Sequence, residues 1–388
     1  MPCQIESIHT LLVDVPTIRP HKLSMTTMAC QTMLIVRMQH SDGIEGLGEA
    51  TTIGGLSYGV ESPEGIKLTI DQYIAPLLIG QPSDNINALQ TRISRYVRGN
   101  QLAKSAIETA LLDAQGKRLG LSVAELLGGP RRTHLPVLWT LASGDTDKDI
   151  EEALSLIETH RHCDFKLKIG ARSPTDDVRH VATIKKAVGA RASIRVDVNQ
   201  AWDEATATRG MAALQDAGID LVEQPICARE YAGMVRLSGR FTLTVMADEA
   251  VADAKDGFTL AAAGFTGAYA LKIAKAGGPI QALGLATVAN AAGIGLYGGT
   301  LLEGTIGTAA SLHAWATLDA VTWGTEMFGP LLFQDDIVTT PLRYHEFGVD
   351  LPKGPGLGIE LDEEKLNYYS RDDGSVRSVP VDARVGKR

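Results

Sequence analysis

Polar residues placed at regular intervals behind short apolar segments constrain the fold of this chain more than any other feature. Asp197, Glu223, Asp248 and Lys272 follow one another at spacings of 26, 25 and 24 residues, from 223 − 197, 248 − 223 and 272 − 248. A strand and its following helix take up roughly this length in a barrel of about 250 residues. The spacing therefore predicts a series of β/α units whose parallel strands end at one common edge.

Eight apolar segments fit the strands of such a barrel: LPVLWTLAS, FKLKIG, SIRVDVNQ, LVEQP, TVMADE, ALKIAK, IGLYGGT and VTWGTEM. An open, doubly wound sheet is the competing topology. It would usually carry a Gly-rich phosphate loop after its first strand, and the sequence WTLASGDT is not such a loop. We therefore expect an α/β fold built on a modified TIM-type (β/α) barrel.

The 388 residues exceed the usual size of a single core, which predicts a second, smaller domain. Residues 5–50 alternate apolar and polar residues around turn signals, which is typical of an antiparallel sheet. Residues 64–128 show helical spacing instead. We predict an N-terminal α+β domain at residues 1–130, the barrel at 131–330, and a C-terminal segment at 331–388 that returns to the small domain and ends in a polar tail.

Composition narrows the range of partners. The formal net charge of −9 disfavours nucleic acid, because such binding depends on Lys and Arg neutralising phosphates. No apolar stretch is long enough to span a membrane, and the first residues lack the pattern of a secretory signal. The four cysteines are scattered without CxxC spacing, so we expect neither a disulfide framework nor a cysteine-based zinc site. The expected location is the cytoplasm.

Three acidic residues, Asp197, Glu223 and Asp248, end the third, fourth and fifth predicted strands. Singly, an acid in this position is more often a helix cap or a solvated loop residue. If the three carboxylates converge to about 4 Å, each pair repels by about 4 kcal/mol at an effective dielectric of about 20, so a cation is needed among them. An all-oxygen site suits Mg²⁺ or Mn²⁺ better than zinc, which favours His and Cys.

Lysines flank these acids. In the segment FKLKI of the second predicted strand, alternation places Lys166 and Lys168 on the face opposite to the apolar residues, inside the barrel. A buried ammonium is costly unless it has a task, and the like charge of Lys166 makes Lys168 a usable base. Lys272 ends the sixth strand, four strands from Lys168, which places it on the opposite wall. Glu326, on the eighth predicted strand, could orient Lys272 or donate a proton.

This constellation resembles the enolase superfamily, and within it the muconate-lactonising branch. The pattern of that branch is KxK, three acids, a lysine and a glutamate, met here at Lys166, Lys168, Asp197, Glu223, Asp248, Lys272 and Glu326. Segments with no obvious chemistry of their own share the resemblance, including GEATTIGGLSYGVESPEGI, LYGGTLLEGTIGT and TEMFGPLL. The resemblance extends over nearly the whole chain.

The resemblance implies a metal-dependent cycloisomerase that converts cis,cis-muconate to muconolactone in catechol degradation. One carboxylate of this small dicarboxylate adds across a double bond, an Mn²⁺ or Mg²⁺ ion stabilises the developing enolate, and Lys168 delivers the proton. Lys272 would stabilise charge from the other face. The small domain would cap the barrel mouth, and the residues expected to contact substrate are His21, Lys22, Ile53, Tyr58, Asn199 and Phe328.

Several other activities use the same lysines and carboxylates. Chloromuconate cycloisomerase, o-succinylbenzoate synthase and amino acid or dipeptide epimerases remain alternatives within the superfamily, and only loop and pocket residues separate them. The segment ATTIGGLSYG and the position of Phe328 resemble the unchlorinated muconate branch. A catalytically silent binding barrel is a further alternative, which predicts a damaged cluster. The resemblance also implies a homo-oligomer, commonly an octamer.

Overall fold

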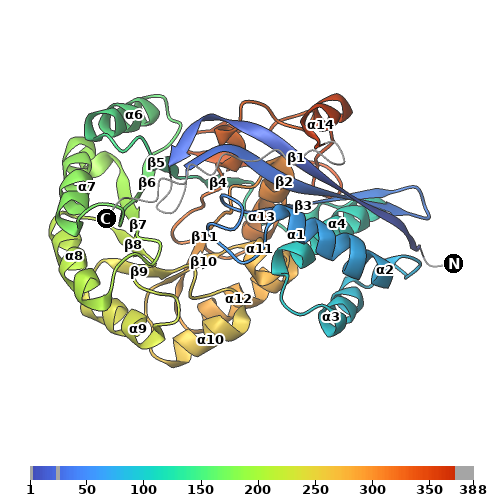
Figure 1. The fold of residues 1–388 in the computed structure, drawn as a ribbon, viewed down its shortest axis with the longest axis horizontal. Helices are drawn as coiled ribbons and strands as arrows, with labels where there is room; N and C mark the ends of the chain where they lie inside the picture. The colour runs from blue at the N-terminus through green and yellow to red at the C-terminus, as the bar shows by residue number, and fades with distance from the viewer. Residues whose placement is uncertain (1–2, 23–26, 372–388) are drawn as a thin grey trace.

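The computed structural model describes residues 3–22 and 27–371, apart from the side chain of Lys22. Its centre is a curled parallel sheet of seven strands, with helices around its outer side (Figure 1). In spatial order the strands are β5 (Trp139–Leu141), β6 (Asp164–Lys168), β7 (Ser193–Asp197), β8 (Leu221–Glu223), β9 (Thr244–Ala247), β10 (Ala268–Leu271) and β11 (Gly295–Gly298).

A short segment at Thr325 closes this sheet. Thr325 forms parallel bridges with Val137, just before β5, and with Gly298, the last residue of β11. The predicted eighth strand is reduced to this segment, since Gly324 has a positive φ of 64° that interrupts the extended backbone. The predicted TIM-type barrel is therefore confirmed, with seven regular strands and one bridged segment.

Helices of the β/α units cover the outer face of the sheet, where apolar strand residues such as Phe165 and Leu167 are buried. Polar side chains cap several of them; Asp145 and Ser173, for example, accept hydrogen bonds from the first turns of α6 and α7. The helices are α6 (Thr146–Glu158), α7 (Pro174–Val188), η2 (Gly189–Arg191), α8 (Glu204–Asp216), α9 (Tyr231–Arg240), α10 (Ala254–Ala262), α11 (Ile273–Ala276), α12 (Pro279–Ala291) and α13 (Thr305–Ala316). Among the described residues, none of the helices combines the length and apolar character needed to cross a bilayer.

The N-terminal part is the predicted α+β unit. Its antiparallel sheet has the order β1 (Ile5–Lys22), β2 (Thr27–His40) and β3 (Glu45–Thr51). Helix α4 (Gln101–Leu119) packs directly on β3, because Gly46 and Gly48 lack side chains where the backbone of α4 approaches. The other helices here are α1 (Pro63–Thr69), η1 (Ile70–Ile74), α2 (Ala75–Leu78), α3 (Ile86–Tyr96) and α5 (Val123–Leu126).

The C-terminal segment runs back to the N-terminal sheet. Phe333 and Ser370 form bridges with Thr17 and Val13 of β1, and α14 (Glu363–Tyr369) also contacts β1. On the way, β12 (Tyr344–His345) and β13 (Gly348–Asp350) join β4 (His134–Pro136) in a small antiparallel sheet after η3 (Gly329–Leu332). The predicted polar tail falls mostly on residues 372–388, which lie outside the described residues.

Hydrogen bonds hold the N-terminal sheet over the barrel. The buried carboxylate of Glu49 on β3 accepts hydrogen bonds from the N–H groups of Gly304 (2.6 Å) and Gly307 (2.8 Å) at the start of α13. Oxygen acceptors at this position satisfy N–H groups that have no partner within the helix. Gln31 on β2 donates to the carbonyls of Leu301 and Leu302 in the loop between β11 and α13. These contacts place the loop after β3 at the carboxyl ends of the barrel strands.

Candidate active site

Strand register brings a lysine and two acids to one level of the barrel wall. Lys168 on β6 lies opposite Asp197 on β7, and Asp197 lies opposite Glu223 on β8. Because residues at one level of neighbouring strands point to the same side, all three side chains enter the barrel at its carboxyl end. The Nζ of Lys168 donates a hydrogen bond to Oδ2 of Asp197, and Asp197 and Glu223 are each only 1% exposed.

The remaining members of the predicted cluster complete the ring. Asp248 directly follows β9 and Lys272 directly follows β10, and both are buried. Three strands, β7, β8 and β9, separate the strand of Lys168 from the strand of Lys272. In a closed eight-position barrel this separation puts the two lysines on opposite walls. The acids therefore lie between two cationic flanks.

Lys166 lies two residues before Lys168 on β6, deeper in the barrel. It links the acids to the segment at Thr325 that closes the sheet. Its Nζ is 2.5 Å from Oε1 of Glu326 and 3.1 Å from Oε2 of Glu223. Burial alone would lower the pKa of Lys166, but Glu223 and Glu326 hold it well above its ordinary value. Lys166 is therefore a permanent cation. Glu326 contacts Lys166 here rather than orienting Lys272, because the segment that carries it lies between β11 and β5, and β5 is the neighbour of β6.

Lys272 and a second lysine share Asp248. The Nζ of Lys272 is 2.6 Å from Oδ2 of Asp248, and the Nζ of Lys275 is 2.6 Å from Oδ1. Although burial alone would raise the pKa of Asp248, Lys272 and Lys275 hold it well below its ordinary range. The hydroxyl of Tyr58 donates to the same Oδ2 at 2.7 Å and lies 3.0 Å from Lys272. A residue of the N-terminal part thus reaches the carboxylate cluster.

One cavity collects nearly all the predicted site residues. Its lining includes the lysines, the acids and Glu326, and from the predicted substrate contacts His21, Ile53, Tyr58 and Phe328. Asn199 is not among the lining residues, but it accepts a hydrogen bond of 3.2 Å from Lys168. Lys22 ends β1, and its side chain lies outside the described part of the chain.

The surroundings fix the charge of one lining residue, His21, and the position of another, Phe328. His21 is buried, and burial together with nearby Lys168 lowers the pKa of its imidazole to about 4, so the ring is neutral near pH 7. Phe328 is 1% exposed and packs against Trp139, with ring centroids 5.2 Å apart. His21 therefore offers a hydrogen bond without charge, and Phe328 offers a fixed apolar wall.

The donor set fits a divalent cation. Asp197, Glu223 and Asp248 supply carboxylate oxygens only, which suits Mg²⁺ or Mn²⁺. Burial, and then the neighbouring Asp197, raises the pKa of Glu223 to about 8, so the protein alone leaves this carboxylate poorly compensated. Four carboxylates and three lysines line the cavity, a formal charge of 3 − 4 = −1. A dication would change this to +1 and make the cavity attractive to an anion.

Some residues that line the cavity were not predicted from the sequence. Thr140 on β5 and Thr300 and Leu302 after β11 face the cavity. Their positions at the carboxyl ends of barrel strands were the available signal, but they carry no charge to distinguish them from core residues. Glu249 was also missed; burial, then Asp248, raises its pKa to about 7, and it accepts a hydrogen bond from Asn199.

This arrangement can transfer a proton at a carbon next to a carboxylate. A cation site would hold the carboxylate, and an ammonium on each side would deliver a proton or balance charge. Burial of the three acids and of Lys272 strengthens these electrostatic effects.

Comparison with known proteins places this geometry in a family. Residues 7–128 match the mandelate racemase/muconate lactonizing enzyme N-terminal domain, and residues 148–365 match the enolase C-terminal domain-like model. The chain is 56% identical to muconate cycloisomerase 1 of Pseudomonas putida, over 95% of this chain and 98% of the relative. It is 45% identical to a chloromuconate cycloisomerase of Pseudomonas sp. (strain P51), over 95% and 99%.

Solved structures agree with the sequence comparison. The muconate lactonizing enzyme of Pseudomonas fluorescens complexed with muconolactone superposes with a TM-score of 0.94 at 57% identity, covering 96% of this chain and 100% of that one. Both the N-terminal and the barrel parts are included in this match. The chain therefore belongs to the mandelate racemase/muconate lactonizing enzyme family of the enolase superfamily.

Proposed function

We propose that this protein is a muconate cycloisomerase, which closes cis,cis-muconate to muconolactone. The observation that carries the proposal is the placement of Lys168 and Lys272 on opposite walls of one cavity, with the three acids between them. Relatives named muconate cycloisomerase, and a relative complexed with muconolactone, support this substrate class. A planar dicarboxylate can lie between the two ammonium groups with one end at the acids.

The proposed reaction is an internal addition. A carboxylate oxygen at one end of muconate forms a C–O bond to the nearer carbon of the distant double bond. The π electrons of that bond move to the carbon next to the other carboxylate, where they are delocalised. The ammonium of Lys168 transfers its proton to this carbon, and Lys168 then regains a proton from water. Lys272, on the opposite wall, balances negative charge without moving a proton.

Asp197, Glu223 and Asp248 are proposed to hold one divalent cation, either Mn²⁺ or Mg²⁺. When bound, the cation would act as a Lewis acid toward the substrate carboxylate, an effect typically of several kcal/mol. Lys166 supports the site by keeping a fixed positive charge beside Glu223, at 3.1 Å. Glu326 in turn fixes Lys166 through their 2.5 Å contact. We therefore assign Lys166 and Glu326 to positioning and charge balance.

Residues of the N-terminal part are proposed to select the substrate. Ile53 and Tyr58 of the loop after β3 line the cavity, and Phe328 lines it from the segment after Glu326. His21, Lys22 and Asn199 are proposed to contact polar atoms of the substrate. The lower identity to chloromuconate cycloisomerases, 45% against 56%, favours the unchlorinated substrate.

Turnover of cis,cis-muconate tests this function. The purified protein with Mn²⁺ or Mg²⁺ should consume muconate, followed by loss of its ultraviolet absorbance, and NMR should identify muconolactone. Chloromuconate, an o-succinylbenzoate precursor and a dipeptide panel serve as competitors and should react more slowly. Faster turnover of any of these would replace the proposed substrate, and metal binding without turnover would support a silent barrel.

The proposal also includes an oligomeric state and a cellular location for the protein. Family resemblance supports a homo-oligomer, with an octamer as the expected state, which size-exclusion chromatography with light scattering would measure. Within the described residues, which include all four cysteines, no disulfide is formed, which suits the reducing cytoplasm.

A further inference from the structure

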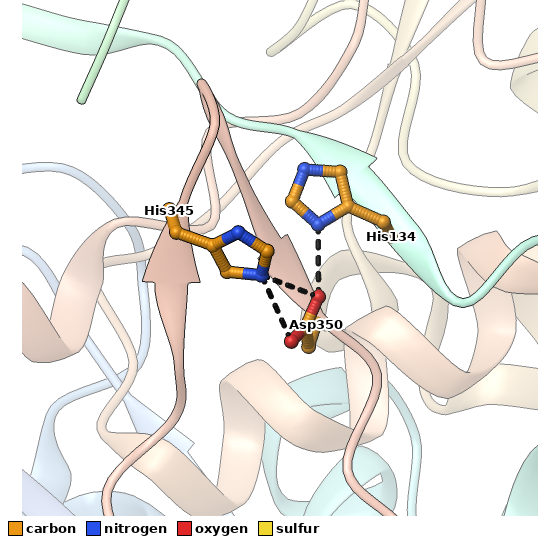
Figure 2. A group of neighbouring side chains, drawn as sticks. All are labelled: His134, His345 and Asp350. Carbon is orange, nitrogen blue, oxygen red and sulfur yellow. Dashed lines mark hydrogen bonds and ion pairs between the residues drawn. The ribbon is translucent and has the colours of Figure 1, made fainter. Parts of the chain in front are cut away.

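A second group of metal-ligating side chains lies in the small antiparallel sheet, away from the cavity. His134 on β4, His345 on β12 and Asp350 on β13 turn toward one another (Figure 2). The central strand of this sheet is β13, and Asp350 is the register partner of His134. One ligand atom from each residue lies within 4.8 Å of the other two. Three strands therefore fix a His-His-Asp cluster.

Both rings direct a nitrogen at the same carboxylate. The Nδ1 of His134 is 2.9 Å from Oδ1 of Asp350. The Nε2 of His345 is 2.9 Å from Oδ1 and 3.0 Å from Oδ2. The two ring centroids are 4.9 Å apart, so the rings reach the carboxylate from neighbouring positions. A single dication placed among the three side chains would contact both nitrogens and the carboxylate.

The second nitrogen of His134 is already occupied. Its Nε2 lies 3.3 Å from the carbonyl oxygen of Glu346, which can only accept a hydrogen bond. With Nε2 against this carbonyl, Nδ1 is the ring nitrogen that faces the oxygen of Asp350. Orientation of a histidine by a backbone carbonyl is also the usual outer-shell arrangement of metal ligands.

We propose that His134, His345 and Asp350 bind a Zn²⁺ ion, with water completing the coordination. Zinc–ligand distances of about 2.0–2.1 Å at tetrahedral angles require ligand atoms roughly 3.3 Å apart, so the nitrogen–oxygen contacts must widen by a few tenths of an ångström. The side chains are 35%, 36% and 33% exposed, which gives them room to adjust and lets water reach the ion. Two imidazoles and one carboxylate suit zinc and reject Mg²⁺.

The site is separate from the one proposed for the reaction. His134 precedes β5 and so lies toward the amino end of the barrel, whereas Lys168 of the cavity is the last residue of β6, at the carboxyl end of the strands. A bound ion would tie the start of the barrel to the C-terminal segment that carries β12 and β13. Its function is therefore structural. Arg343, 3.9 Å from Oδ2 of Asp350 and mostly exposed, is a nearby cation that the ion would displace.

Metal counting in the presence of excess Mg²⁺ tests the proposal. Zinc can also enter the carboxylate site, so the zinc that reports the imidazole cluster is the difference between chelator-treated, zinc-dialysed full-length wild type and a variant that lacks a cluster ligand. Elemental analysis should find about one more Zn²⁺ per chain in the wild type than in His345→Ala, and this zinc should raise the melting temperature. His345→Ala and Asp350→Asn should each lose this zinc and its stabilisation while keeping wild-type turnover of muconate. His160→Ala, which removes a neighbouring exposed histidine that contacts Glu346, is the matched control and should keep both.

Two results would overturn the proposal. Equal zinc content in the wild type and His345→Ala would show that the cluster is an ion pair only. Equal loss in His160→Ala would show that the zinc binds surface histidines without this geometry.

Discussion

Tyr58, on the loop after β3, donates a hydrogen bond of 2.7 Å to Oδ2 of Asp248 at the end of β9. The same hydroxyl lies 3.0 Å from the Nζ of Lys272, so one N-terminal residue touches both a proposed metal ligand and a proposed catalytic lysine. Closure of the cavity and alignment of its charges are thus coupled through a single side chain.

Removal of this hydroxyl should affect chemistry more than binding. Tyr58→Phe keeps the ring that closes the cavity but loses two hydrogen bonds to charged groups, each typically of about 1.5–3 kcal/mol. We expect kcat to fall by about tenfold or more with a smaller change in KM, since Lys272 loses its alignment. Tyr73→Phe, at a residue that is 62% exposed, is the control and should be unchanged. A Tyr58→Phe enzyme with wild-type kcat would show that the hydroxyl plays no part in alignment.

Replacement of one of the three acids should weaken metal binding without lowering the stability of the metal-free protein. Burial raises the pKa of Glu223 to about 8, so the protein without metal gains nothing from this charge. Glu223→Gln should weaken Mn²⁺ affinity by roughly 100-fold or more, because charge pairs at this spacing are worth several kcal/mol. Calorimetric titration measures the affinity. The melting temperature of metal-free Glu223→Gln should equal or exceed that of the metal-free wild type, and a large drop would contradict this account of the site.

The interdomain carboxylate Glu49 should make stability depend on pH. Burial raises its pKa from 4.5 to about 8 despite hydrogen bonds from Gly307 and Gly304. The folded state then holds a proton that the unfolded state has released, so the contribution of Glu49 is complete below pH 4.5 and is lost as the pH rises to about 8. Glu49→Gln cannot ionise. Across this window the wild type should lose stability relative to Glu49→Gln by about 1.4 kcal/mol per pH unit.

Urea unfolding of the two proteins at several pH values measures this difference. A constant difference between about pH 5 and about pH 8 would mean that Glu49 is ionised throughout the range.

A substitution at Gly48 tests the packing of the N-terminal part, and Gly284 in the barrel helix α12 serves as its control. An added Cβ at Gly48 would lie 2.0 Å from the carbonyl oxygen of Ala106 in α4, so Gly48→Ala should cost about 3 kcal/mol or more. Gly284, on the exposed side of α12, has no atoms near an added Cβ. Gly284→Ala should stabilise the protein by about 0.5–1 kcal/mol, because alanine favours the helix. Thermal unfolding of both variants checks the signs, and a harmless Gly48→Ala would contradict the close approach of β3 to α4.

Much of this architecture could be predicted because the signal is periodic. The spacing of Asp197, Glu223 and Asp248 reflects whole β/α units, and alternation in FKLKI fixes which face carries Lys166 and Lys168. These patterns are local in the sequence, and closure of the barrel brings the residues that carry them together in a ring. The cavity lining contains the three predicted metal ligands, Glu326 and the three predicted catalytic lysines.

Contacts that depend on barrel closure could not be predicted in this way. Glu326 pairs with Lys166 because the bridged segment at Thr325 enters between β11 and β5, and spacing alone does not give its depth. The cluster of His134 and His345 joins residues 345 − 134 = 211 positions apart, through strands of three residues or fewer. Such short strands carry no usable periodicity.

The central claim is that Lys168 moves a proton on one face of the substrate, and isotope exchange tests it most directly. Muconolactone incubated with the wild type in D₂O should gain one deuterium, at a single stereochemical position of the carbon next to the free carboxylate. Lys168→Ala should bind Mn²⁺ as tightly as the wild type and show exchange slowed by about 10³-fold or more. Exchange at the wild-type rate by Lys168→Ala, or equal labelling of both positions by the wild type, would contradict the account.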